Sequence, residues 1–355
     1  MNNQLNTKTV QVGDLKLGGN NPVRVQSMCD TDTRNIEATV NQILQLEKAG
    51  CEIIRVAIPD MEAAKAIGKI KKQIHIPLVA DIHFDYQLAI EAVNQGIDKV
   101  RINPGNIGSE EKVKAVVKAC KENNVPIRIG VNGGSLEKEL TEKYGHTPKA
   151  AVESALKHIR ILEKLNFYEI LVSIKFSEVK PMVESYRLLS QKVNYPLHLG
   201  ITHAGTKTMG TVKNSIGIGT LLAKDIGATI RVSLTAPLEE EIRVGWNILE
   251  AMRKRKRGPK LISCPTCGRT EIDMMSLTEK VENALQETKK PITVAVMGCV
   301  VNGPGEAKEA DVGVAGGKGK GAIFAKGKII KTVEEKDILP ALLKEIEKIT
   351  TKNNN

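Results

Sequence analysis

The sequence predicts an α/β protein: an N-terminal (β/α)8 barrel of the TIM type, followed by a smaller α/β domain. Three observations lead to this prediction. Eight short, mainly apolar runs occur before residue 240, and stretches with helical spacing separate them. The chain of 355 residues is long enough for a barrel of about 250 residues and one further domain. Its 41% hydrophobic and 26% charged residues are typical of a globular protein.

The predicted strands are rich in valine and isoleucine, as strands buried on both faces of a parallel sheet should be. They cover residues 22–28, 51–58, 76–82, 99–105, 126–132, 169–175, 197–203 and 229–235. A doubly wound sheet is the alternative, but it rarely contains eight evenly spaced units. No GxGxxG motif follows any of these runs, and the nearest approach, GIGT at 217–220, stops short. We therefore favour the barrel.

The stretches between the strands carry apolar residues at spacings of three and four, which is typical of helices. The clearest cover residues 35–50, 61–73 and 109–124. Several begin at Asp, Ser or Thr, and the first ends at Gly50; these residue types start and stop helices. Each repeat is thus a strand followed by a helix.

A charged, Gly/Pro-marked segment, RKRKRGP at 253–259, follows the last predicted barrel helix and reads as a linker. We therefore predict a barrel domain at 1–252, a linker at 253–259 and a second domain at 260–355. The second domain contains CPTCGRTEID, an apolar strand at 291–298, the segment CVVNGPGE, a glycine-turn hairpin within 311–333 and a closing helix at 336–350.

Charge and composition narrow the classes of partner. Lys and Arg number 52 against 41 Asp and Glu, a net charge of +11, which indicates an anionic partner. The aromatic residues (Phe 4, Tyr 5, Trp 1) do not interleave a basic run, so a nucleic-acid partner is disfavoured. No run is apolar enough to span a membrane, and the N-terminus lacks the pattern of a signal peptide. We expect a cytoplasmic protein without a membrane partner.

Function in a (β/α)8 barrel lies at the C-terminal ends of the strands. Many of the residues there are cations. This predicts a site for phosphate groups, because Arg binds phosphate through two hydrogen bonds and Lys supplies a point charge. The alternative is that individual arginines pair with carboxylates inside the barrel wall. Asp81 and His83 have two interpretations: they form an acid/base pair, or they are metal ligands. The candidates are Arg55, Asp81, His83, Arg101, Asn103, Arg128, Asn132, Lys175, His203, Arg231 and Ser233.

The strongest signal lies in the second domain. Cys264 and Cys267 stand across one tight turn, and Cys299 follows a later strand. The Gly-Pro-Gly turn in CVVNGPGE returns Glu306 towards Cys299 as a fourth ligand. Three thiolates with one oxygen ligand favour an iron–sulfur cluster, whereas structural zinc usually takes four Cys or His ligands. Zinc remains the alternative, in an RNA-modification protein or a phosphate-binding barrel. The other cysteines, Cys29, Cys51 and Cys120, read as core residues.

These segments together resemble one family. SCPTCGR and MGCVVNGPGE, preceded by QSM, TDT, KVRINPGN, IRIGVN, IGIG and IRVSL, are similar to the motifs of the bacterial 4-hydroxy-3-methylbut-2-enyl diphosphate synthase family of the methylerythritol phosphate isoprenoid pathway. The likeness runs from about Val12 to about Phe324 in the expected order, and MGCVVNGPGE is very specific.

The resemblance implies a [4Fe–4S] enzyme. It reductively opens 2-C-methyl-D-erythritol 2,4-cyclodiphosphate to the linear allylic diphosphate and water, with two electrons from a flavodoxin or ferredoxin. It works as a head-to-tail homodimer in which one chain's cluster domain closes over the other chain's barrel mouth. By motif, the cluster ligands are Cys264, Cys267, Cys299 and Glu306. The implied substrate contacts are Arg55, Arg101, Arg128, Asn132, Lys175, Ser233 and Asn302.

The chain departs from the family pattern at three places. His203 stands in GITHAG where the family usually has Glu, its candidate acid/base group; an imidazole can also donate a proton. Cys29 stands where the family has Thr or another small polar residue. The phrase SLTAPLEEEI is one residue shorter than usual, which predicts a shifted eighth loop.

Overall fold

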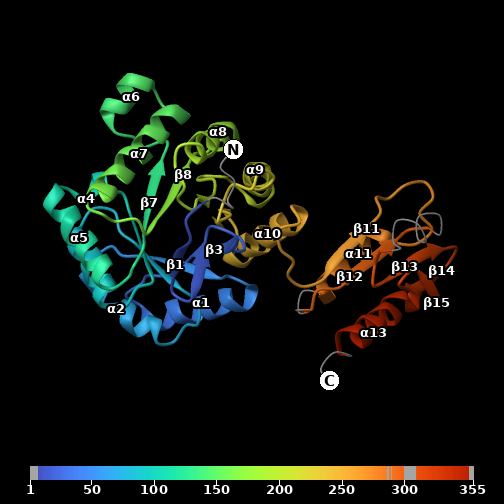
Figure 1. Cartoon of the computed structure of the whole chain (residues 1–355). Helices are drawn as coiled ribbons and strands as arrows, with labels where there is room; N and C mark the ends of the chain where they lie inside the picture. The colour runs from blue at the N-terminus through green and yellow to red at the C-terminus, as the bar shows by residue number, and fades with distance from the viewer. Residues whose placement is uncertain (1–6, 286–287, 289, 300–308, 352–355) are drawn as a thin grey trace. The chain divides into compact units, whose positions relative to one another are not determined.

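The computed structural model describes residues 7–285, 288, 290–299 and 309–351. The chain divides into two compact units, Met1–Arg255 and Lys256–Asn355, which we call the barrel unit and the C-terminal unit (Figure 1). Among the described residues no helix is both long and apolar enough to cross a membrane.

The barrel unit is a parallel eight-stranded barrel, as predicted. The strands pair in the order β8-β7-β6-β5-β4-β3-β10-β9, and a parallel bridge between Val172 and Leu197 joins β8 to the chain just before β9. β9 and β10 are shorter than the predicted runs because the polar residues that end those runs belong to loops. The strands are β3 (Arg24–Met28), β4 (Ile53–Ala57), β5 (Leu78–Asp81), β6 (Lys99–Ile102), β7 (Ile127–Asn132), β8 (Ile170–Lys175), β9 (His198–Leu199) and β10 (Thr229–Ile230).

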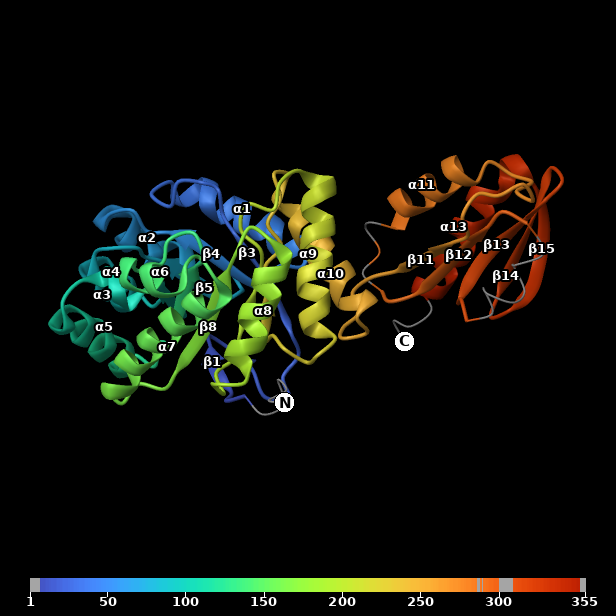
Figure 2. The same cartoon turned by 90° about the horizontal axis from the view of Figure 1, so that it is seen from above.

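Helices surround the strands (Figure 2). The predicted start and stop signals operate: the Asp60 side chain accepts a hydrogen bond from the Ala63 amide at the start of the second helix, and Gly50 ends the first helix at a φ of 106°. The helices are α1 (Ile36–Ala49), α2 (Met61–Lys71), α3 (Tyr86–Asn94), α4 (Pro104–Ile107), α5 (Glu110–Glu122), α6 (Lys138–Tyr144), α7 (Pro148–Lys164), α8 (Val179–Ser190), α9 (Lys207–Leu222) and α10 (Leu238–Ala251).

An N-terminal hairpin precedes the barrel and was not predicted. β1 (Val10–Val12) pairs antiparallel with β2 (Leu15–Leu17) across a turn at Gly13. Its apolar side chains pack against Ile53, Val79 and Leu171, which lie in or near the first halves of their strands. The hairpin therefore covers the end of the barrel where the strands begin and leaves the opposite end for the site.

The basic run that follows α10 is partly fixed to the barrel. Arg255 Nη1 donates to the Val23 carbonyl oxygen at 2.8 Å and to Glu52 Oε2 at 2.6 Å, and the Arg255 guanidinium lies 4.6 Å from the centre of the Trp246 ring. Lys254 pairs with Asp225. These side chains act as ordinary structural partners in the barrel unit.

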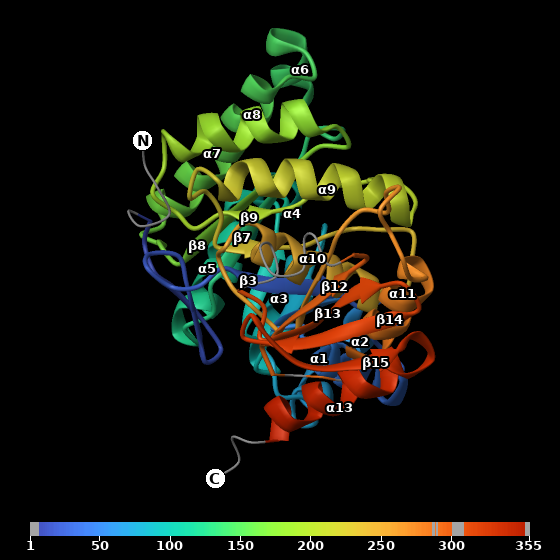
Figure 3. The ribbon, with the colours of Figure 1, turned by 90° about the vertical axis from the view of Figure 1, so that its right-hand side faces the viewer.

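The C-terminal unit is one five-stranded sheet with helices on one face (Figure 3). β11, β12 and β13 are parallel, and β14 and β15 continue the sheet antiparallel. The predicted hairpin is therefore a three-stranded meander, because Lys326 and Gly327 form a second turn at positive φ. Its elements are β11 (Lys260–Ser263), α11 (Met274–Leu285), β12 (Thr293–Met297), β13 (Val312–Gly317), β14 (Lys320–Ala325), β15 (Lys328–Glu334), a 3-10 turn (Glu335–Asp337) and α13 (Ile338–Thr351).

Candidate active site

Buried cations come from three barrel strands: Arg101 and Lys175 lie near or at the C-terminal ends of β6 and β8, and Arg128 is the second residue of β7. Arg128 is 1% exposed, Arg101 7% and Lys175 8%. Burial and repulsion from Arg231, Arg55 and the other arginines hold the pKa of Lys175 well below its ordinary value. These cations therefore share one electrostatic environment. We call Arg55, Arg101, Arg128, Lys175 and Arg231 the cationic ring.

Asp81 is the carboxylate that holds one side of this ring. Its Oδ1 accepts a hydrogen bond from Arg101 Nη1 at 3.1 Å, and its Oδ2 lies 3.6 Å from both Arg55 Nε and His83 Nε2. Burial alone would raise the pKa of Asp81, but Arg55, His83 and Arg101 outweigh it and hold that pKa well below its usual range. Asp81 is thus an ionised counter-ion, and two of the arginines do pair within the wall.

Two glycines make room for the ring: Gly130 inside β7 and Gly200 directly after β9. Arg101 Nη2 donates to the Gly130 carbonyl oxygen at 3.2 Å, and a Cβ on Gly130 would lie 2.3 Å from Arg101 Nε. A Cβ on Gly200 would lie 3.1 Å from Lys175 Nζ and 2.7 Å from the Arg231 carbonyl oxygen. A glycine inside a strand signals such a close approach, and neither was singled out from the sequence.

Arg128 keeps donors for a ligand. Its Nη1 donates to Ser173 Oγ at 3.1 Å, whereas its Nε and Nη2 have no hydrogen-bond partner among the described residues. A guanidinium stays charged in proteins, so these buried donors are costly unless an anion or water meets them. Arg128 is therefore built to be completed by an acceptor.

The remaining barrel candidates follow the strand ends. Asn132 lies beside Lys175 in the register of β7 and β8, and Asn103 directly follows β6. The Ser233 carbonyl oxygen accepts a hydrogen bond from Asn214 Nδ2 at 3.2 Å. His203 is exposed at a φ of 51°, and its Nδ1 lies 3.3 Å from Thr202 Oγ1. The structure thus brings Asn132 to the ring but shows no bond from His203 to it within the described chain.

Sequence reasoning missed a sulfur ligand and a second carboxylate. Met28 Sδ lies 2.9 Å from Arg55 Nε and 3.6 Å from Arg231 Nη1, so a weak thioether acceptor separates two guanidinium groups. Glu241, at the start of α10, is 4% exposed and lies 3.9 Å from Arg231 Nε. Met28 is the last residue of β3, but an uncharged thioether is not a residue type that signals a phosphate site, and Glu241 lies on a helix, which the strand-end rule does not cover.

The cysteines of the C-terminal unit gather at one edge of its sheet. Cys264 follows β11, and Cys299 stands two residues after β12, its parallel neighbour. The Gly298 amide donates to Cys264 Sγ at 3.2 Å. Hydrogen bonding to the Arg269 backbone, together with the Arg269 side chain, lowers the pKa of the exposed Cys267 thiol. Glu306 and Asn302 lie outside the described residues.

The thiols do not converge on a single point. In the part of the chain that the structure describes, no three His, Cys, Asp or Glu side chains gather tightly enough to hold one metal ion. Asp81 and His83 likewise have no third metal ligand among the residues that the structure describes. Burial raises the pKa of Cys29, Cys51 and Cys120 to about 12, which fits inert thiols in the core.

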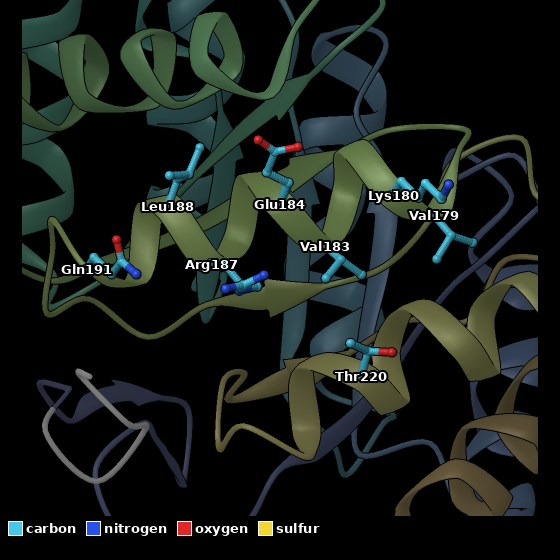
Figure 4. A pocket seen from close by; sticks show the side chains of 8 residues that line it. All are labelled: Val179, Lys180, Val183, Glu184, Arg187, Leu188, Gln191 and Thr220. Atoms are coloured by element: carbon cyan, nitrogen blue, oxygen red, sulfur yellow. The ribbon is translucent and has the colours of Figure 1, made fainter.

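A separate hollow of about 570 Å³ lies on the outside of the barrel between α8 and α9 (Figure 4). Its lining comes almost entirely from one face of α8, with Thr220 from α9, and includes no cysteine or histidine. It belongs to the helix layer and not to the strand ends. The convergent chemistry of the barrel is therefore at the cationic ring.

Comparison with known proteins agrees with these two units. Residues 7–246 match the GcpE TIM-barrel domain, and residues 260–348 match the GcpE protein C-terminal domain. Two proteins named 4-hydroxy-3-methylbut-2-en-1-yl diphosphate synthase (flavodoxin) are highly similar. That of Caldanaerobacter subterraneus subsp. tengcongensis is 61% identical over 344 residues, covering 97% of each chain. That of Clostridium perfringens is 60% identical over 348 residues, covering 98% of this chain and 100% of that protein. The resemblance inferred from the motifs is confirmed, and the chain belongs to the GcpE family.

Proposed function

We propose that the chain is an enzyme, a 4-hydroxy-3-methylbut-2-en-1-yl diphosphate synthase. It opens 2-C-methyl-D-erythritol 2,4-cyclodiphosphate reductively and releases 4-hydroxy-3-methylbut-2-enyl diphosphate and water, using two electrons from flavodoxin or ferredoxin. The observation that carries this proposal is the cationic ring, three of whose five members are buried, in the barrel of a chain that belongs to the GcpE family. A cyclic diphosphate supplies the anionic oxygens that such a ring needs.

The ring binds and orients the diphosphate. The Nε and Nη2 of Arg128, which have no partner among the described residues, donate to phosphate oxygens, and Lys175 adds positive charge beside Asn132. Asp81 holds Arg55 and Arg101 in place and does not itself contact the anion, because two negative groups would repel each other. His83, Asn103, Ser233 and, from the C-terminal unit, Asn302 complete the substrate contacts.

The family resemblance implies a [4Fe–4S] cluster, and the described cysteines fit it. Cys264 and Cys299 follow two adjacent parallel strands, and Cys267, in the turn after Cys264, has a lowered pKa, which suits iron. Each thiolate of such a cluster binds a different iron, so the three need not converge on one ion. Cys264, Cys267 and Cys299 would hold the cluster with Glu306. When bound, the cluster supplies single electrons from the donor protein. His203, exposed in the loop after β9, is our proposed proton donor for the departing hydroxyl.

Other features of the proposal rest on the family. We propose the head-to-tail homodimer, in which the C-terminal unit of one chain serves the barrel of the other. We also propose a cytoplasmic location without nucleic-acid or membrane partners. Six free cysteines suit a reducing compartment.

The test is anaerobic turnover. Protein purified without oxygen should be brown, contain about four irons per chain, and convert the cyclodiphosphate to the linear allylic diphosphate with a reduced one-electron donor. A colourless protein with one zinc and no turnover would support the zinc alternatives instead. Replacing Cys120, a buried core cysteine, is the matched control and should leave the iron content unchanged.

A further inference from the structure

The loop that follows β10 carries two of the predicted site residues, Arg231 and Ser233. Hydrogen bonds to neighbouring segments of the barrel hold this loop in place. Asn214, fully buried on α9, donates from Nδ2 to the Ser233 carbonyl oxygen at 3.2 Å and to the Gly210 carbonyl oxygen at 2.8 Å. The Thr235 amide donates to the Gly205 carbonyl oxygen at 3.0 Å. Neutral hydrogen bonds thus fix the backbone of this loop.

Glu241 is the charged anchor of the same loop. Its Oε1 accepts from the Leu234 amide at 2.9 Å, and its Oε2 accepts from Ser27 Oγ at 3.3 Å. The same Oε2 lies 3.9 Å from Arg231 Nε. One carboxylate therefore links α10 to the loop, to β3 and to a cation of the ring.

The need for a carboxylate follows from the donors around it. Leu234, Ser27 and Arg231 all present N–H or O–H groups, and only an ionised carboxylate accepts on both oxygens without bringing a donor of its own. A buried carboxylate at 4% exposure is costly unless paired. Arg231 is the cation that pairs with it, as Asp81 pairs with Arg55 and Arg101 elsewhere in the ring.

We propose that Glu241 is a positioning residue for the reaction. It holds the Arg231 guanidinium and the Ser233 loop in the orientation that meets the substrate, and it does not touch the substrate itself. The inference rests on the proposed function, because the ring must bind a diphosphate for this orientation to matter. Met28, between Arg55 and Arg231, keeps the two guanidinium groups apart on the other side.

Proton binding to Glu241 should weaken this arrangement. Burial raises the pKa of Glu241 above its ordinary value, while Arg231 and the hydrogen bonds from Leu234 and Ser27 oppose that rise. The charged groups that face it are Arg231 from the loop after β10, Lys175 from β8 and Arg55 from β4. As pH falls through the raised pKa, the neutral acid loses its attraction for Arg231. The kcat/KM of the wild type should then fall on the acid side.

A double-mutant cycle tests the role. Glu241→Gln should lower kcat/KM about tenfold in the wild type but less than twofold in an Arg231→Met background, because its effect passes through Arg231. The acid limb of the pH profile should disappear in Glu241→Gln. Glu240→Gln, on the same helical turn and paired with Arg243 and Lys207, is the matched control and should leave turnover unchanged. Equal losses in both backgrounds would reduce Glu241 to a structural residue and overturn the inference.

A second variant tests the same role and is used if Glu241→Gln folds poorly. Ser27→Ala removes one donor to the ionised carboxylate and keeps its charge, so the acid limb should move to higher pH. An unmoved limb would count against the proposal. Calorimetry with inorganic diphosphate separates the two levels of inference. A wild type that does not bind diphosphate contradicts the proposed function, whereas binding together with an additive cycle contradicts only the role of Glu241.

Discussion

The cationic ring differs in what holds it together from the cysteine edge, by which we mean Cys264, Cys267 and Cys299 at one edge of the sheet in the C-terminal unit. In the ring, protein atoms fix the charged groups: Asp81 holds two arginines, and Glu241 lies beside a third. At the cysteine edge, Cys299 is buried but Cys267 is exposed, and the thiols do not converge within the described residues. Preorganised donors suit a substrate that must be gripped repeatedly, whereas a metal site often gains its final geometry when the metal binds. The two regions should therefore respond differently to substitution.

The largest expected effect comes from a substitution that abolishes the function of the cysteine edge and leaves the cationic ring intact. Cys264→Ala removes a proposed cluster ligand, so iron content and turnover should be lost, with activity falling by more than about a thousandfold. The affinity for inorganic diphosphate should stay within twofold of the wild type, because the ring holds itself together. Iron analysis and calorimetry on the same sample measure both. A parallel loss of diphosphate affinity would show that the two regions are not independent.

Asp81→Asn should break the ring from within. Removing the shared partner of two buried arginines is expected to cost about 3 to 5 kcal/mol of the free energy of unfolding at neutral pH. The contribution of Asp81 is fully present above the ordinary carboxyl pKa of about 3.9 and is lost as pH falls below it, because the pKa is depressed in the folded state. The difference between variant and wild type should therefore shrink at low pH.

The fluorescence of Trp246, the chain's single tryptophan, reports unfolding of the barrel unit in this comparison. If the difference in the free energy of unfolding between variant and wild type stays constant from pH 7 to well below about 3.9, the arginine partners do not depress the pKa of Asp81 in the folded state.

A smaller effect is expected from Gly130→Ala. The new methyl group would occupy the space of the Arg101 guanidinium, so diphosphate affinity should fall about tenfold and stability by about 1 to 3 kcal/mol. Gly134→Ala is the matched control, because a Cβ there meets nothing within 4 Å. Equal affinities for diphosphate in the two variants would mean that the position of the Arg101 guanidinium against Gly130 of β7 does not matter for binding.

Most of the fold could be predicted from the sequence because its signals are local. Valine-rich runs and helix caps mark the strand–helix repeats, and Gly50 ends α1 where expected. The N-terminal hairpin and β15 were missed although each has a turn signal: Gly13 and Asp14 separate two alternating runs, and Lys326 and Gly327 separate β14 from β15.

The site was predictable only as far as strand ends reveal it. The cations of the ring lie within the strands or directly after them, so their residue types and spacing identify them, although Arg55 is in the middle of β4 and Arg128 is near the start of β7. Glu241 and Met28 act across more than two hundred residues of sequence, on Ser27 and Arg231 respectively. Such contacts depend on barrel closure and register, which one sequence does not encode locally. The pairing of Asp81 with Arg55 also needed the register of β4 against β5.

The most direct test of the account is the affinity of the ring for inorganic diphosphate, measured by calorimetry on wild type and Arg128→Met. Methionine keeps much of the buried volume and removes the donors that have no partner among the described residues. The account predicts binding to the wild type and a dissociation constant raised at least about tenfold in the variant, the loss of charge-assisted hydrogen bonds. Equal dissociation constants would contradict the claim that the cationic ring is the diphosphate site.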